Sequence, residues 1–363
     1  MRLALDGTPL LGTRTGVAQV VDGLLEGLAA RDDVDVVAYA VSGRRRLDDG
    51  LPPGVATGSS RVPARLAREL WDRVDRPRIE HWTGPVDVVH ATNYVAPPAR
   101  APVVVSVYDL TFVRFPELCT PDTLRYPRLV RRAVERGAHV HVTSDFVGSE
   151  VADAFGVDPT RIRRVYPGIA PVAGGDAARG RALAQADEYV LALGTVEPRK
   201  NLPALVRAFD GFAAERDGTK LVVAGPDGWG VEAYTTAARE ARARDRIVRL
   251  GFVSDDDRRH LLAGASAFAY PSVYEGFGFP PLEAMAAGVP VVAGAAGSLP
   301  EVLGDAAALV DPSDVDALAG ALLRAVGDRG WREQAAARGT ERAGRFTWPV
   351  AVEAMVALYR SVL

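Results

Sequence analysis

The sequence predicts an α/β protein made of two Rossmann-like domains with parallel sheets, and three observations support this. The chain has 363 residues, which is too long for one ordinary core and fits two domains of about 150 to 200 residues. Short apolar runs alternate with amphipathic segments along the chain, as in parallel α/β proteins. A stretch rich in proline and glycine at 164–173 interrupts this alternation, so we place the domain boundary there.

The apolar runs give the strands in order. In the first half we predict strands at 2–5, 34–40, 86–90, 103–108 and 139–143. In the second half we predict strands at 189–194, 220–224, 247–250, 267–270 and 289–293. The last helices are expected from about residue 331 to residue 363. Ligands of such sheets bind beyond the carboxyl ends of the strands, so we expect the active site in a cleft between the halves.

Composition excludes several classes of protein. A hydrophobic content of 48%, a charged content of 25% and a net charge of −3 give no general attraction to nucleic acid. The single cysteine, Cys119, excludes an intrachain disulfide and a cysteine-based zinc site. The N-terminal apolar run is cut by Asp6 and Gly7, and the longest uncharged run, 284–300, is broken by glycine and proline. We therefore expect neither a signal peptide nor a membrane span, and a cytoplasmic location.

The stretch 272–290 carries the most informative pattern in the chain. A predicted strand runs into a loop that contains Gly276 and Gly278, and a helix is expected to begin at Pro280 or Pro281. Glycine lets the backbone approach a ligand closely, and proline suits a first helical turn because its missing N–H needs no partner there. The N–H groups of residues 276–279 would point outward beside the positive end of the helix dipole, which suits an anion.

Two carboxylates flank this expected anion site. Glu275 lies in the loop and Glu283 lies eight residues later, near the start of the helix. A carboxylate repels a neighbouring phosphate, so we expect these two side chains to accept hydrogen bonds from hydroxyl groups instead. A phosphate with hydroxyl groups on both sides describes a nucleotide sugar.

A basic corner at 194–201 follows the first strand of the second half. Arg199 and Lys200 are placed there to neutralise a diphosphate, and Asn201 is expected to cap the next helix. The chain contains only two lysines, the other being Lys220, against 41 arginines. A lysine inside this motif therefore indicates that a compact ammonium group is needed. A solvated basic turn is the structural alternative.

Two further loops follow predicted strands. Gly12 and Gly16 lie between the first strand and the first helix, where backbone N–H groups could face the same phosphate or simply form a turn. In the second half, Ser254 is expected to cap a helix that begins with three aspartates, 255–257. Carboxylates suit a helix N-terminus, so we expect no metal ion there.

The stretch resembles the E-x7-E signature of retaining glycosyltransferases of the GT-B fold, family 4. The matching positions besides the two glutamates are Pro271, the two glycines, the proline pair and 287–290. This family includes many bacterial mannosyltransferases. The resemblance covers the whole chain and is strongest over 194–312. It implies an N-terminal acceptor-binding domain over 1–168, a nucleotide-sugar-binding domain over 169–345 and a C-terminal helix, 346–363, that crosses back to the N-terminal domain. It also implies no cofactor and no bound divalent ion.

The resemblance assigns roles to individual residues. Glu275 would contact the transferred sugar and Glu283 the ribose, while Arg199 and Lys200 would hold the leaving pyrophosphate. Backbone atoms near residue 252 would edge the nucleobase. The sequence has Thr195 where the family often has arginine. The full expected donor set is Gly12, Gly16, Tyr108, Thr195, Arg199, Lys200, Phe252, Val253, Glu275, Gly276, Phe277, Gly278, Leu282 and Glu283.

The acceptor side is predicted at the ends of two N-terminal strands. Many relatives have a histidine where this chain has Tyr108, which cannot become cationic at neutral pH. His90, one strand away, either substitutes as a catalytic group or is a satisfied buried histidine. Asp109 either binds an acceptor hydroxyl or caps a turn, and Asn93 is a further acceptor candidate. We interpret His141 and its strand neighbour at position 139 as structural.

Arginine-rich segments at 61–82 and 125–136 are candidates for peripheral contact with an anionic membrane at its inner face, and solvated helix faces are the alternative. The sequence as a whole predicts a metal-independent retaining hexosyltransferase. Its best-matching reaction is mannosyl transfer from GDP-mannose to a hydroxyl of a glycan, lipid or polysaccharide. A sugar-nucleotide 2-epimerase and a catalytically silent nucleotide-sugar-binding subunit are the alternatives.

Overall fold

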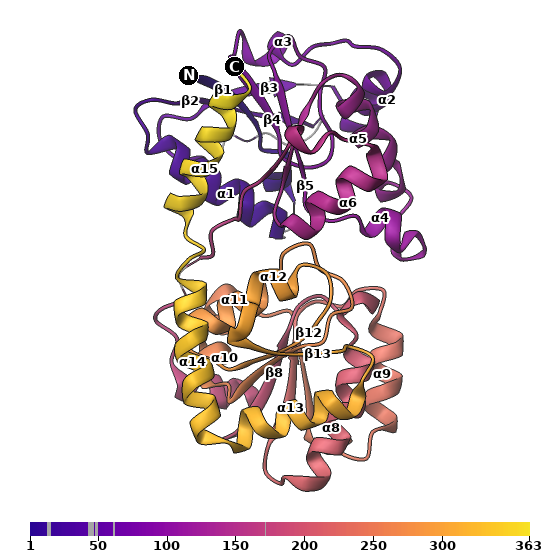
Figure 1. Cartoon of the computed structure of the whole chain (residues 1–363), viewed down its shortest axis with the longest axis vertical. Coiled ribbons are helices and arrows are strands. Elements are labelled where there is room, and N and C mark those ends of the chain that lie inside the picture. Colours follow the sequence, from indigo (N-terminus) through magenta and orange to yellow (C-terminus); the bar gives the residue numbers. More distant parts are fainter. Residues whose placement is uncertain (13–15, 43–46, 48–49, 61, 171) are drawn as a thin grey trace. The chain divides into compact units, whose positions relative to one another are not determined.

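Two parallel β-sheets, one in each half of the chain, organise the structure (Figure 1). The structure is a computed structural model that describes all residues except 13–15, 43–46, 48–49, 61 and 171. Contacts divide the chain into unit 1, which contains Met1–Gly168 and Phe346–Leu363, and unit 2, which contains Ile169–Arg345. The predicted α/β class with parallel sheets is confirmed.

Unit 1 contains a seven-stranded parallel sheet in the order β3-β2-β1-β4-β5-β6-β7. Its strands are β1 Arg2–Asp6, β2 Asp35–Val41, β3 Ala56–Ser60, β4 Val88–Ala91, β5 Val103–Val107, β6 His139–Val142 and β7 Ile162–Arg164. Its helices are α1 Gly16–Ala29, α2 Ala64–Arg73, α3 Glu80–Thr83, α4 Thr111–Arg114, α5 Tyr126–Glu135, α6 Asp145–Phe155 and α15 Trp348–Ser361.

Unit 2 contains a six-stranded parallel sheet in the order β10-β9-β8-β11-β12-β13. Its strands are β8 Tyr189–Leu193, β9 Lys220–Ala224, β10 Ile247–Gly251, β11 Ala267–Tyr270, β12 Val291–Gly294 and β13 Ala307–Val310. Its helices are α7 Ala177–Ala184, α8 Leu202–Glu215, α9 Val231–Glu240, α10 Asp255–Gly264, α11 Phe279–Ala286, α12 Leu299–Leu303, α13 Val315–Gly327 and α14 Arg329–Ala343.

All ten predicted strands are present, with ends shifted by no more than a few residues, but three strands were not predicted. These are β3 and β7, the two edges of the sheet of unit 1, and β13, one of the two edges of the sheet of unit 2. An edge strand pairs on one side only, so it needs little of the apolar run that marks a central strand. β3 reads Ala-Thr-Gly-Ser-Ser and β7 reads Ile-Arg-Arg, which carry almost no such signal.

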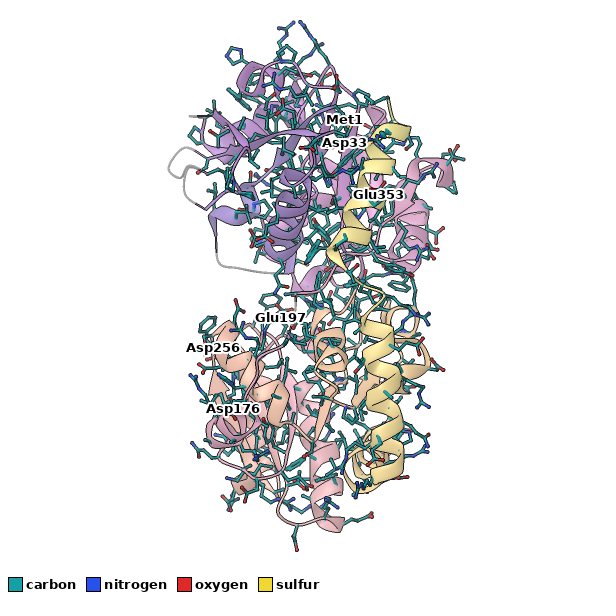
Figure 2. All side chains as sticks on the ribbon, turned by 90° about the vertical axis from the view of Figure 1, so that its left-hand side faces the viewer. Met1, Asp33, Asp176, Glu197, Asp256 and Glu353 are labelled. Atoms are coloured by element: carbon teal, nitrogen blue, oxygen red, sulfur yellow. The ribbon has the colours of Figure 1, made fainter. Side chains whose placement is uncertain are left out.

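The last helix, α15, packs on α1 of unit 1 (Figure 1). Gly23 and Gly27 leave a flat strip on α1, because a Cβ at these positions would lie 2.2 Å from the Trp348 ring and 2.4 Å from Val352. Arg31 Nη1 lies 2.6 Å from Glu353 Oε2 at the rim of this contact, and Figure 2 shows Glu353 on the helix. Absence of a side chain on α1 thus makes room for a helix from the far end of the chain.

The two arginine-rich helices of unit 1 use their apolar residues differently. α5 buries Val130, Ala133 and Val134 in the core of the unit. α2 buries Trp71 on one side and exposes Leu66 and Leu70 on the other. Over the described parts of the chain, no helix combines the length and the apolar character that crossing a membrane requires.

Strand order reverses once in each sheet, between β1 and β4 in unit 1 and between β8 and β11 in unit 2. The connections leave in opposite directions at these points, which opens a crevice beyond the carboxyl ends of the strands. A ligand site is therefore expected at the residues that follow β8 and β11 in unit 2, and at those that follow β1 and β4 in unit 1.

Candidate functional site

The loop between β11 and α11 brings Glu275 to the switch point of unit 2. β11 ends at Tyr270 and α11 begins at Phe279, one residue before the first of the two predicted starts. Gly278 precedes the helix with φ +101°, and a Cβ there would lie 2.7 Å from Leu299 Cδ2. Only glycine fits this position without strain, so the sequence of the loop sets where the helix begins.

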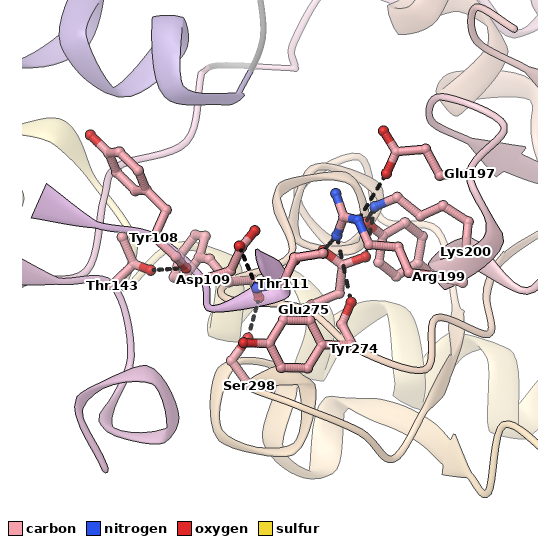
Figure 3. Close-up of polar contacts among 12 residues, drawn as sticks. Tyr108, Asp109, Thr111, Thr143, Glu197, Arg199, Lys200, Tyr274, Glu275 and Ser298 are labelled. Carbon is pink, nitrogen blue, oxygen red and sulfur yellow. Dashed lines mark hydrogen bonds and ion pairs between the residues drawn. The ribbon is translucent and has the colours of Figure 1, made fainter. Parts of the chain in front are cut away.

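Glu275 is bound by both basic residues of the corner after β8 (Figure 3). Arg199 Nη1 lies 2.7 Å from Glu275 Oε2, and Lys200 Nζ lies 2.6 Å from Glu275 Oε1. Lys200 Nζ also donates to the Tyr270 hydroxyl at 2.5 Å, and Arg199 Nε donates to Glu197 Oε2 at 2.8 Å. The predicted sugar contact and the predicted phosphate contacts are therefore one ion-paired cluster, which the sequence did not reveal.

Burial and pairing act against each other in this cluster. Glu275 is 5% exposed. Desolvation raises the pKa of the Glu275 carboxyl, but Arg199 and Lys200 outweigh it and hold that pKa at about 2. Desolvation also lowers the pKa of Lys200, and the charge of Glu275 opposes this shift. The cluster thus pairs one carboxylate with two basic side chains in a largely buried site.

The corner that carries the two cations is held by backbone contacts. Gly194 follows β8 with φ +141°, and a Cβ on Gly225 would lie 2.1 Å from the Gly194 carbonyl oxygen. Val273 N donates to the Arg199 carbonyl oxygen at 2.9 Å, which joins the corner to the Glu275 loop. Asn201 stands at the N-cap position of α8, as predicted, but its side chain makes no capping hydrogen bond, and its Nδ2 donates to the Pro312 carbonyl oxygen at 2.7 Å. Asn201 adopts the left-handed conformation, which turns its side chain away from the first helical turn.

Glu283 lies on α11 with its side chain only 1% exposed. Arg258 Nη1, from α10, lies 3.0 Å from Glu283 Oε2. Desolvation raises the pKa of Glu283, and the charge of Arg258 partly offsets this. Arg258 was not among the predicted site residues, because nothing in the local sequence shows that it reaches across to Glu283.

The other residues of unit 2 that were predicted to bind the sugar donor differ in how far their side chains are exposed to solvent. Phe252 is 74% exposed directly after β10, and Val253 and Thr195 are partly exposed. Leu282 is fully buried and Phe277 is 5% exposed. Leu282 therefore contributes to the core of unit 2 and presents no side chain to a ligand. Gly276 and Gly278 are buried as well, and because they have no side chain they could contact a ligand only through their backbone.

The three aspartates after Ser254 have structural partners. Ser254 Oγ accepts from Asp257 N at 3.0 Å, which confirms the predicted cap of α10. Asp255 lies 3.6 Å from Arg258, and Asp256 lies 2.9 Å from Arg259. Within the described residues, no three histidine, cysteine, aspartate or glutamate side chains are grouped as metal ligands.

In unit 1, the predicted glycine loop is only partly described. Gly12 ends a short 3-10 helix, Thr8–Leu11, and is exposed, while Gly16 is the first residue of α1. The intervening residues, 13–15, lie outside the described part of the chain. Gly12 therefore follows β1 after a short helical turn, and β1 borders the switch point of the sheet.

His90 is a satisfied buried histidine, so we do not retain it as a catalytic candidate. Its side chain is inaccessible, with Nδ1 2.8 Å from the Tyr359 hydroxyl and Nε2 2.8 Å from Ser106 Oγ. Ser106 Oγ also lies 2.8 Å from His141 Nδ1, and His141 Nε2 lies 3.2 Å from the Val165 carbonyl oxygen. The four side chains form a continuous relay across β4, β5 and β6 that ends on α15.

The relay has one consistent direction. The Val165 carbonyl oxygen can only accept, so His141 Nε2 carries the hydrogen and His141 Nδ1 accepts from Ser106. Ser106 then accepts from His90 Nε2, and His90 Nδ1 accepts from Tyr359. Both imidazoles are neutral in this arrangement. Burial lowers the pKa of His90 well below its usual value, and burial lowers the pKa of His141 to about 4.

We expect the relay to make unit 1 less stable in mild acid. An unfolded histidine takes up a proton near pH 6.5, whereas folded His141 does so only near pH 4, so the free energy of unfolding falls between these values by about 1.4 kcal/mol per pH unit. Asp6, whose pKa burial raises to about 6, acts in the opposite direction. The test is the variant His141→Gln, whose amide can donate to Val165 and accept from Ser106. Urea unfolding at about pH 7, 6 and 5 should show that the free energy of unfolding falls less steeply with falling pH in this variant than in the wild type. Equal slopes for both proteins would contradict this.

The remaining unit 1 candidates lie at the carboxyl ends of β4 and β5. Asp109 Oδ1 accepts from Thr111 N at 3.0 Å, so it caps the turn before α4, as the structural alternative predicted. The Tyr108 hydroxyl is buried, and desolvation raises its pKa above the usual value. Asn93 is partly exposed. Asn93 thus stays a candidate for a ligand contact, while Asp109 is already engaged.

Sequence reasoning missed Asp6 at the switch point of unit 1. Asp6 ends β1, is 6% exposed, and its Oδ1 accepts from Thr8 N at 2.9 Å. Thr92 Oγ1 donates to the Asp6 carbonyl oxygen at 2.7 Å, which links the ends of β1 and β4. The sequence does show Asp6 as an acid directly after the apolar run Leu-Ala-Leu. In the sequence analysis this acid counts only as evidence against a signal peptide.

Comparison with known proteins covers nearly the whole chain. Residues 177–342 match the model of "Glycosyl transferases group 1", and residues 14–172 match that of "Glycosyltransferase Family 4". The chain is 34% identical over 270 residues to O-antigen chain mannosyltransferase B of Escherichia coli, covering 72% of this chain and 71% of that protein.

Solved structures share the fold. Sucrose-phosphate synthase from Thermosynechococcus elongatus has a TM-score of 0.78 at 21% identity, covering 99% of this chain and 98% of that one. Anabaena Alr3699/HepE in complex with UDP and glucose has a TM-score of 0.75 at 20% identity, with 100% of both chains covered. The fold is therefore GT-B, as the resemblance of the sequence implied.

Proposed function

Because the chain belongs to the family 4 glycosyltransferases of group 1, we propose that it transfers a mannosyl group from GDP-mannose to an acceptor hydroxyl, with retention of configuration. The observation that carries the proposal is the Arg199–Glu275–Lys200 cluster at the switch point of unit 2. The choice of mannose rests on the E. coli relative, which is named as an O-antigen chain mannosyltransferase. The proposed product is accordingly a polysaccharide or a related glycan.

In this proposal the two cations of the cluster hold the diphosphate of the donor. The Arg199 guanidinium and the Lys200 ammonium stabilise the negative charge that builds on the pyrophosphate as the bond to the sugar breaks. The departing phosphate oxygen accepts the proton of the acceptor hydroxyl on the same face of the sugar, which gives retention. Fixed charges of this kind act most strongly in a site with little water, and all three side chains are largely buried.

Glu275 has two tasks in the proposed mechanism. Before the donor binds, it neutralises two buried cations that would otherwise be costly to desolvate. When the donor binds, its diphosphate takes over part of the pairing with Arg199 and Lys200. Lone pairs of the Glu275 carboxylate then become available to accept hydrogen bonds from hydroxyl groups of the sugar. Glu283, held by Arg258, would accept from the ribose in the same way.

We propose that the reaction needs no divalent ion. The positive charge that a metal would bring to the diphosphate is supplied here by the side chains of Arg199 and Lys200. This part of the proposal is tested directly by adding EDTA to the transfer assay, and a requirement for added magnesium or manganese would overturn it.

Nucleotide-dependent stabilisation tests the donor. Among GDP, UDP, ADP and dTDP and their common sugar conjugates, we expect GDP and GDP-mannose to raise the melting temperature most. A ligand present at about 100 times its dissociation constant adds about 2.7 kcal/mol, which amounts to several degrees for a chain of this size. Lys200→Met should lose this shift, and Lys220→Met, which changes the only other lysine, should keep it. A larger shift with UDP would reject the proposed base.

A transfer assay tests whether the sugar keeps its configuration and whether a mannose-containing glycan is accepted. Incubation with GDP-mannose and a mannose-containing acceptor should yield an α-linked product, identified by the anomeric signals in its NMR spectrum. A β-linked product would overturn retention. If the protein binds the nucleotide but shows neither transfer nor slow hydrolysis of the donor, the catalytically silent subunit is favoured instead.

For the proposed peripheral contact with a membrane, α2 is the best-supported surface. It exposes Leu66 and Leu70, which are 49% and 36% accessible, and Val74 directly after it is 48% accessible. Leu66 and Leu70 are four residues apart and share one face of α2, and Val74 follows the helix in an extended conformation. Exposed arginines at 73 and 76 follow the same segment.

A further inference from the structure

A second concave site lies in unit 1 at the amino-terminal ends of β5 and β6. We call it the basal groove and define it by its polar lining residues Asp75, Arg78, Arg100, Arg136 and His139 together with small apolar residues of 96–103 and 133–138. Its volume is about 500 Å³, which is within the usual range for small-molecule sites. It involves none of the residues of the proposed transfer site, which follow the carboxyl ends of their strands.

The cations of the basal groove are only partly neutralised. Arg136 is paired, because its Nη2 lies 2.5 Å from Asp75 Oδ1 and donates to the Trp71 carbonyl oxygen at 2.7 Å. Arg78 and Arg100 make no side-chain hydrogen bond or ion pair with any described residue. The groove therefore holds two unengaged guanidinium groups and one acid that is already paired.

His139 contributes an imidazole to the edge of the basal groove. It stands at the first position of β6, and its imidazole has no hydrogen bond to the residues that the structure describes. Desolvation lowers the pKa of His139, and the charges of Arg161 and Arg163 lower it further. Arg163 lies on β7 and Arg161 directly before it, and β7 is the strand next to β6 in the sheet.

Glu80, which is not part of the lining, bonds through one carboxylate oxygen to the backbone of the segment that carries Arg100. Glu80 Oε1 accepts from Arg100 N at 2.5 Å and from Ala101 N at 3.1 Å. These two bonds fix the turn that carries Arg100 at the rim of the groove. Glu80 thereby positions Arg100 instead of pairing with its guanidinium, which leaves the guanidinium for a ligand.

We propose that the basal groove binds a phosphate group, with Arg78 and Arg100 as its principal donors and His139 at its edge. Guanidinium groups donate two parallel hydrogen bonds to phosphate, and an ionised partner strengthens each bond. A phosphate fills only part of about 500 Å³, and the alanine and proline walls suit an organic remainder. The ligand class is thus a phosphate ester, either a soluble phosphomonoester or the headgroup of an anionic lipid.

Titration of inorganic phosphate, followed through the imidazole proton signals of His139 in the NMR spectrum, tests the proposal. The signal is assigned with His139→Gln, and it reports the basal groove separately from Arg199 and Lys200. We expect phosphate to shift this signal and to raise the pKa of His139, because an anion stabilises the imidazolium. The double variant Arg78→Ala/Arg100→Ala should weaken binding at least tenfold.

Arg125→Ala/Arg131→Ala is the matched control, because it removes two exposed arginines from the α5 segment outside the groove. It should bind phosphate as the wild type does. Equal binding by the wild type and the Arg78→Ala/Arg100→Ala variant would overturn the proposal, and so would an equal loss in the control. Glycosyl transfer should be unaffected by the double variant, so failure here is distinguishable from failure of the proposed function.

The source of the phosphate is decided by two further ligands. Glycerol 3-phosphate that competes with inorganic phosphate, without cosedimentation with vesicles, indicates a soluble ester. Cosedimentation with vesicles of phosphatidylcholine and phosphatidic acid, but not with phosphatidylcholine alone, indicates a lipid headgroup if the double variant loses it. If the double variant still cosediments with the phosphatidic acid vesicles, and phosphate does not shift the His139 signal, the vesicles bind to another surface. That result would reject the basal groove as a phosphate site.

Discussion

Lys200→Met will lower the turnover of glycosyl transfer by at least about 100-fold, the usual cost of removing one fixed charge donor from a site of developing negative charge. The substitution keeps the length and the apolar stem of the side chain and removes only the ammonium group. Lys200 Nζ lies 2.6 Å from Glu275 Oε1 and 2.5 Å from the Tyr270 hydroxyl, and no other lysine is near. Arg199 alone then faces the diphosphate.

The loss in turnover must be separated from a loss of folding. Removing one partner of a buried ion pair costs about 3 to 5 kcal/mol, but Glu275 keeps Arg199 at 2.7 Å, so we expect the lower part of this range. Circular dichroism and thermal unfolding of Lys200→Met should show a folded protein with a reduced melting temperature. Lys220→Met is the control, since Lys220 Nζ contacts only the Gln185 carbonyl oxygen among the described residues. Full turnover in Lys200→Met would remove the lysine from the mechanism.

Gly297→Ala will disrupt the same site from the opposite side. Gly297 has φ +60°, and a Cβ there would lie 2.5 Å from the Glu275 carbonyl oxygen and 2.7 Å from Glu275 N. Ser298 N also donates to the Glu275 carbonyl oxygen at 2.9 Å, so this segment supports the backbone of the catalytic candidate. We expect a loss of about 2 to 4 kcal/mol in stability from strain and overpacking. Transfer should fall at least tenfold, because a displacement of about 1 Å can cost 100-fold.

Gly320→Ala is the matched control for this substitution. Gly320 lies in the middle of α13 with no atom within 4 Å of a built Cβ. Alanine there should stabilise the protein by about 0.5 to 1 kcal/mol, because alanine favours helix more than glycine does. Urea unfolding and initial transfer rates measured on both variants decide the matter. A Gly297→Ala protein with wild-type rates and stability would show that the loop can move away without loss.

Much of the fold followed from local patterns. Central strands of a parallel sheet are buried on both faces, so they appear as continuous apolar runs, and all ten predicted runs are strands, nine of them central and one, β10, at an edge. The edge strands β3 and β7 lack that pattern because burial on one side demands less of their sequence. The cap of α10 by Ser254 was predictable for a similar reason, since the donor and the acceptor are three residues apart.

Residue identities at the site were predictable, but their partners were not. Glu275, Arg199 and Lys200 were selected as separate groups for sugar and phosphate, whereas the structure pairs them across 75 and 76 residues of sequence. His90 was a catalytic candidate from its place at a strand end. Its partner Tyr359 lies 269 residues away on α15, and only that contact shows that both of its ring nitrogens are used.

The sequence by itself determined two parallel α/β units, the glycine loop before α11 and the set of charged residues at the strand ends, because periodicity and turn chemistry act over a few residues. The tertiary structure decided which charges neutralise each other, which histidines are satisfied, and that α15 completes unit 1. Ion pairs and burial depend on contacts between segments that the folding of the sheets brings together. The Arg199–Glu275–Lys200 cluster exists because β8 and β11 are neighbours in the sheet, although β9 and β10 separate them along the chain.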